Sequence, residues 1–148
     1  MFQVALFHSV VLSATRRITS ADLRAVAERA GAECRATVLS TGNLILRDPG
    51  DPAALEQRLE AATADLLGKS IAVFVRSAAD FHALVAANPF AQETATNPAR
   101  VAVRVLRAPA SPASLARITA KLRDGERFLA QPARCGSAPP TLGPIHRC

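Results

Sequence analysis

The chain has 148 residues, 49% of them hydrophobic, which is enough for one compact domain or two small packed units. It carries 18 Lys and Arg against 12 Asp and Glu, a net charge of +6 that fits a phosphate-bearing partner, although arginines scattered over solvated faces give the same sum. Three cysteines at irregular spacing exclude a disulfide framework, so we expect a reducing, cytoplasmic setting.

The chain begins with an apolar, uncharged segment, residues 1–15. This segment lacks the basic region of a signal peptide and is shorter than the roughly 20 apolar residues of a membrane span, so we expect no membrane partner. Within it, residues 4–7 (VALF) are typical of a strand in the middle of a sheet whose two faces are both covered. A predicted loop over residues 8–18 follows and ends in two arginines.

A helix and a hairpin come next. Thr19, with Asp22 three residues later, is typical of a capping box, and Gly31 is a natural helix stop, so these residues bound a predicted helix. We expect strands at residues 35–39 and 44–47, because the Ser-Thr-Gly-Asn segment between them favours a tight turn.

A second helix and a fourth strand complete the first half. Asp51 is a good cap and Pro52 suits the first helical position, while Gly68 ends the segment. The predicted apolar stripe of this helix consists of Leu55, Leu59, Ala62 and Leu66. Residues 71–75 (IAVFV) are apolar throughout, which predicts another central strand.

The second half again alternates helices and strands. Ser77 with Asp80 predicts a capped helix, residues 101–106 a strand, and Ser111-Pro112 the start of a further helix. Residues 127–130 could form one more strand. The predicted elements of this half are followed by an aperiodic tail rich in Pro, Gly and Ser, which we expect to be disordered.

The expected fold is therefore α/β (α+β). Residues 1–76 form a predicted ferredoxin-like βαββαβ unit, residues 77–130 a second α/β unit that could be incomplete, and residues 131–148 the disordered tail. Such a scaffold does not by itself name a chemistry.

Three segments carry a resemblance to a known family: ADLR at residues 21–24, TGNL at residues 41–44 and VAANPF at residues 85–90. Their order and spacing resemble the uncharacterised bacterial family called domain of unknown function 1697, from about residue 2 to about residue 127. The resemblance implies a fold of two α/β units and no activity. The chain departs from it in a loop without glycine after the first strand and in the tail, which we interpret as a frame-shifted or truncated end.

The arginines before the first helix suggest one candidate site. Arg16, Arg17 and Asn43 would lie near a helix N-terminus if the first and third strands are neighbours, and such a group can bind a small anion. An acyl phosphate or phosphate ester would then be the substrate, as in acylphosphatases, although their cradle is rich in glycine. The alternative is two surface arginines and a turn asparagine.

Other chemistries find little support. His8 lacks a nucleophile elbow nearby, and His82 is expected on a helix surface. Cys135, His146 and Cys148 match no zinc-site spacing, so we expect no metal, and the absence of phosphate-binding glycine motifs indicates no nucleotide cofactor.

The sequence leaves the catalytic residues and the ligand unknown. The first hypothesis is a non-catalytic binding or interaction module, in which an uncovered edge of the strand at 101–106 would favour a homo-oligomer. The second is the small-anion enzyme, and the third is a weak nucleic-acid binder that acts through its net charge.

Overall fold

The computed structural model describes residues 1–9, 11–12, 16–38, 42–130 and 142–146. The chain divides into two compact units, Met1–Phe81 and His82–Cys148, and each is described by itself below.

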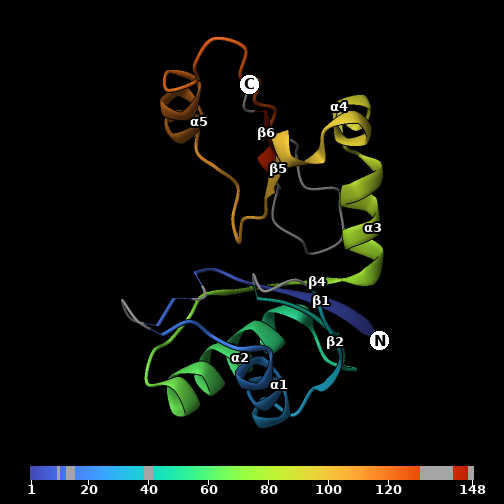
Figure 1. Ribbon diagram of the computed structural model, residues 1–148, viewed down its shortest axis with the longest axis vertical. Helices are drawn as coiled ribbons and strands as arrows, with labels where there is room; N and C mark the ends of the chain where they lie inside the picture. The colour runs from blue at the N-terminus through green and yellow to red at the C-terminus, as the bar shows by residue number, and fades with distance from the viewer. Residues whose placement is uncertain (10, 13–15, 39–41, 131–141, 147–148) are drawn as a thin grey trace. The chain divides into compact units, whose positions relative to one another are not determined.

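The first unit is a four-stranded antiparallel sheet with two helices on one face (Figure 1). The strands lie in the order β2-β3-β1-β4, and every neighbouring pair is antiparallel. This order is compatible with the ferredoxin-like arrangement, and the predicted α/β fold is confirmed. The elements are β1 (Phe2–Phe7), α1 (Ser20–Arg29), β2 (Glu33–Val38), β3 (Asn43–Arg47), α2 (Pro52–Leu67) and β4 (Val73–Ser77).

Local signals set the ends of α1 as expected. The Thr19 side chain accepts a hydrogen bond from the backbone N–H of Asp22, and the Asp22 carboxylate accepts one from the backbone N–H of Thr19, so the capping box is complete. Ala30 is the C-cap, and Gly31 follows it with a φ of +74°, a conformation that glycine adopts without strain.

Helix α2 also begins and ends where the sequence indicates. The Asp51 side chain accepts hydrogen bonds from the N–H groups of Ala53 and Ala54, and Pro52 takes the first helical position. Gly68 closes the helix in the left-handed conformation, with a φ of +70°. The prediction that Leu66 belongs to the buried apolar stripe of this helix was wrong, because Leu66 is 45% exposed.

The core of this unit lies between the sheet and the two helices. Alternate residues of each strand point toward the helices, as the burial along β1 shows. The largest fully buried apolar side chains are Leu44, Leu46, Leu55, Leu59, Val26, Val73 and Val75.

Strand order supports one prediction and corrects another. Residues 4–7 do lie in a central strand, since β1 pairs with both β3 and β4. The apolar segment at 71–75 was predicted to be central as well, but β4 lies at the edge of the sheet. Its apolar sequence reflects burial by helix α2, which packs directly against it.

The second unit contains short elements. Strand β5 (Val101–Arg104) pairs with β6 (Leu142–His146) in an antiparallel two-stranded sheet. The helical elements are α3 (Ala78–Ala86), which continues from the first unit into the second, α4 (Ala91–Thr96), the 3-10 helix η1 (Pro98–Arg100) and α5 (Pro112–Thr119).

The second half differs from two expectations. Residues 127–130 do not form the predicted strand, because Ala130 alone has a bridge there. Of the tail expected to be disordered, residues 131–141 and 147–148 lie outside the described residues, while residues 142–146 form β6. The predicted domain boundaries stay predictions.

Candidate functional site

The residues of the predicted anion site lie on β3 and on the loop that leads to α1. Strands β1 and β3 are neighbours as expected, and Asn43 stands opposite Leu6 at the start of β3. The backbone of Arg17 forms an isolated bridge with Val11, and the Arg17 side chain is exposed. The Arg16 guanidinium lies 3.8 Å from the Asp22 carboxylate.

The N-terminus of α1, where a bound anion was expected, already has a carboxylate beside it. Asp22 Oδ2 accepts hydrogen bonds of 2.9 Å from both the backbone N–H and the hydroxyl of Thr19. These two bonds, the backbone one first, and the nearby Arg16 lower the pKa of Asp22 against a smaller opposing effect of burial. An incoming anion would therefore meet a charged Asp22, and the anion site stays a prediction.

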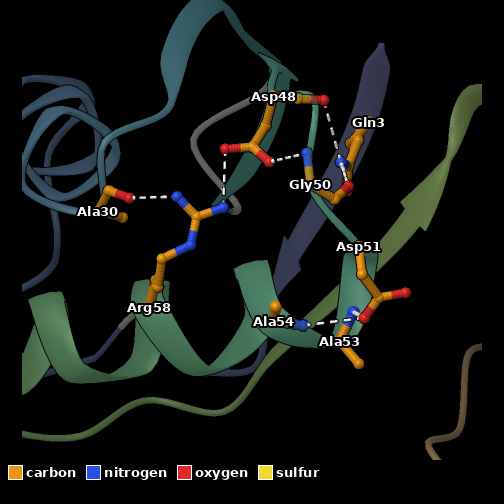
Figure 2. A network of polar contacts seen from close by, with 8 residues as sticks. All are labelled: Gln3, Ala30, Asp48, Gly50, Asp51, Ala53, Ala54 and Arg58. Atoms are coloured by element: carbon orange, nitrogen blue, oxygen red, sulfur yellow. Dashed lines mark hydrogen bonds and ion pairs between the residues drawn. The ribbon is translucent and has the colours of Figure 1, made fainter.

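A second polar cluster, which the sequence did not suggest, ties the end of β3 to α2 (Figure 2). The Asp48 side chain is only 2% exposed, and its Oδ2 accepts a 2.7 Å hydrogen bond from Arg58. A second nitrogen of Arg58 donates to the carbonyl of Ala30 at the end of α1, and Asp48 Oδ1 accepts from the N–H of Gly50. Arg58 thus joins both helices to the loop that follows β3.

Gln3 completes this cluster from the central strand. Its Nε2 donates to the carbonyl oxygens of Gly50, at 2.8 Å, and of Asp48, at 3.3 Å. The side chain is fully buried, and its Oε1 has no hydrogen-bond partner in the described part of the chain. The other hydrogen bonds of the cluster all join one part of the protein to another, so the cluster stabilises the fold.

A third polar group covers the outer edge of β4. The N–H groups of Ile71, Val73 and Val75 donate to side chains of α2. The acceptors are Thr63, Glu60 and Glu56, in that order. Glu56 also pairs with the guanidinium of Arg76, at 3.3 Å, and both side chains are almost completely buried. Helix α2 therefore satisfies backbone groups that a sheet edge normally exposes.

The remaining candidate side chains do not form a reactive cluster in the portion that the structure describes. His8 and His82 are exposed. Cys34 is a free, half-buried thiol whose pKa burial raises, which disfavours the reactive thiolate. The described residues contain no group of three or more His, Cys, Asp or Glu that could hold a metal ion. Cys135 and Cys148 lie outside them, as does the side chain of His146.

Charge is divided unevenly between the two units. Residues 1–81 contain nine Lys or Arg and nine Asp or Glu, so their formal net charge is zero. Residues 82–148 contain nine Lys or Arg and only three acidic residues, so they carry the whole excess of +6. Scattered arginines were one explanation of the net charge, but counting each half of the sequence separately reveals the division.

The basic excess is concentrated in one stretch. Residues 94–123 contain no Asp or Glu and include six cations, whose side chains are all exposed: Arg100, Arg104, Arg107, Arg117, Lys121 and Arg123. In the first unit arginines also form ion pairs with carboxylates, as Arg29 does with Asp65 and Arg47 with Glu33. The second unit therefore differs from the first in carrying more cations than carboxylates.

A family model described as "Protein of unknown function (DUF1697)" matches residues 1–134 of the chain, which confirms the resemblance predicted from the sequence. No curated protein and no solved structure matches the chain. None of the helices in the described ranges is long and apolar enough to cross a membrane.

Proposed function

Because the chain belongs to this family of proteins of unknown function, whose description assigns no activity, we propose a function from the charge distribution: a non-catalytic binding module whose partner is a polyanion. The observation that carries the proposal is the division of charge, zero over residues 1–81 and +6 over residues 82–148. The electrostatic field of a positively charged region attracts a negatively charged partner and raises its rate of association.

The first unit supports a scaffold role in this proposal. Its most buried charged side chains hold the fold together: Asp48 bonds to Arg58, and Glu56 bonds to both Arg76 and the backbone of β4. Catalytic acids and bases instead need access to a substrate and a pKa suited to proton transfer. A stable, neutral platform that carries a basic second half is consistent with binding.

A cytoplasmic location belongs to the same proposal. The half-buried thiol of Cys34 is compatible with a reducing compartment, where polyanions such as nucleic acids are abundant.

The test is chromatography of the full chain on immobilised heparin, a polyanion, with elution by a salt gradient. Any basic protein binds a cation exchanger, so a sulfopropyl column run under the same conditions is the control. We expect elution from heparin at a clearly higher salt concentration than from sulfopropyl, since a polyanion can contact several cations at once. Elution at the same salt concentration from both columns would contradict the proposal.

A further inference from the structure

We infer that the polyanion is the phosphodiester backbone of a nucleic acid, and that the basic stretch of residues 94–123 holds it without reading the bases. This inference rests on the proposed function and adds the class of partner and the surface. It is carried by two pairs of exposed cations, one at β5 and one at α5. Both elements are labelled in Figure 1.

The first pair flanks β5. Arg100 immediately precedes this strand and Arg104 ends it, so one exposed arginine lies at each end of β5. Arginine side chains at the two ends of a strand can each donate hydrogen bonds to phosphate oxygens.

The second pair lies on and just after α5. Arg117 is in the last turn of the helix, and Lys121 lies in the turn that follows the C-cap Ala120. The apolar residues of the helix, Leu115 and Ile118, are half-buried. A helix that binds a membrane surface turns its apolar side outward into the lipid, so this arrangement favours a hydrophilic polyanion over an anionic membrane.

The composition of the surface favours backbone contacts over base recognition. Proteins that bind single strands by stacking expose aromatic rings to the bases. The chain has no Trp or Tyr, and in residues 82–148 Phe90 is buried and Phe128 is half-buried. Five of the six cations in residues 94–123 are arginines, whose planar guanidinium groups suit phosphate. We therefore expect binding that depends on salt and not on sequence.

The experiment measures fluorescence anisotropy of a labelled oligothymidylate of about 20 nucleotides, longer than a typical single-strand site, over about 50 to 200 mM salt. The full-length wild type is compared with two double variants, R100Q/R104Q and R117Q/K121Q. Each lost phosphate contact should reduce the slope of log K against log salt by about 0.7. We expect each double variant to reduce it by about 1.4, while an oligonucleotide of mixed sequence binds the wild type equally well.

The matched control is R29Q/R47Q, which removes the same charge from two exposed arginines of the first unit that form ion pairs. This variant should change the slope little, and thermal unfolding must show that all variants remain folded. If the three variants weaken binding equally, or if vesicles of phosphatidylglycerol bind the wild type more tightly than the oligonucleotide does, the inference fails and the broader polyanion proposal stands. A wild type that binds neither heparin nor DNA overturns both.

Discussion

The fold favours the ionised form of Asp22. Two hydrogen bonds from Thr19 and the charge of Arg16 favour its carboxylate, so its pKa in the folded chain lies below the ordinary value of 3.8. A group with a lowered folded-state pKa stabilises the protein above its unfolded-state pKa, and this contribution disappears as the pH falls through the folded-state pKa. The contribution of Asp22 should therefore be full near neutral pH and lost in acid.

The corresponding variant is Asp22→Ala, which removes one half of the capping box of α1. At about pH 7 we expect it to lower the free energy of unfolding by about 0.5–1 kcal/mol, in the range of helix-terminal interactions. The difference from wild type should shrink as the pH is lowered below the ordinary pKa of 3.8, because the carboxyl group then gains its proton in the folded chain as well. Urea unfolding over this pH range measures the effect. Asp22→Glu, which keeps the charge, is the control, and a difference that stays constant with pH would contradict the assignment.

At the scale of elements, the contact between α2 and β4 replaces a neighbouring strand. Thr63, Glu60 and Glu56 lie three or four residues apart on one side of the helix. The amides that donate to them lie two residues apart, on β4 and just before it. Acceptors that recur once per turn of the helix therefore face amides that recur at every second residue of the extended chain. The edge amides of β4 are satisfied within the chain, so this edge is a poor site for another strand to pair with.

Thr63→Val tests this edge, because valine has nearly the shape of threonine without its hydroxyl. The Thr63 side chain is fully buried and its Oγ1 accepts the N–H of Ile71 at 3.0 Å. Leaving that buried amide unsatisfied should lower the free energy of unfolding by about 1–3 kcal/mol in urea titration. Thr63→Ser keeps the acceptor and loses one methyl group, about 0.8 kcal/mol at full burial, so it should cost less. The edge would be unimportant if valine were tolerated better than serine.

The elements also show what the sequence could and could not predict. The capping box of α1, the Asp51-Pro52 start of α2 and the glycines that end both helices were predictable, because each depends on residues within one turn. The edge position of β4 was not, because a strand covered by a helix is as apolar as a central one. The buried pair of Glu56 and Arg76 was also missed, since charged residues in a helix are usually exposed.

The candidate site could also be predicted only in part. The expected topology made β1 and β3 neighbours, and it therefore placed Asn43 near the start of the loop that follows β1. The sequence predicted the capping role of Asp22. It did not indicate that the Asp22 carboxylate would also lie beside Arg16. The loop geometry that brings the two together depends on the whole segment between β1 and α1.

At the scale of the whole molecule, the two units differ in burial as well as in charge. The first unit has a continuous core of buried apolar side chains. Among the described residues of the second unit, Phe90 is the one apolar side chain that is buried. The guanidinium of Arg127 lies over its ring, 4.7 Å from the centroid, and also pairs with Glu93. Short helices with so little buried area gain little stability from packing.

Hydrogen exchange followed by mass spectrometry should reveal this difference. We expect amides of β1, β3 and α2 to exchange at least about 100-fold more slowly than those of α4, β5 and α5, because opening the second unit exposes little apolar surface. Adding oligothymidylate should slow exchange in peptides from residues 94–123 and leave α2 unchanged, since a ligand stabilises the segment that it contacts. Equal protection of α2 and α5 in the free chain would show that the second unit is as stable as the first. Protection by the oligonucleotide that appears only in the first unit would place the polyanion on the wrong half of the molecule.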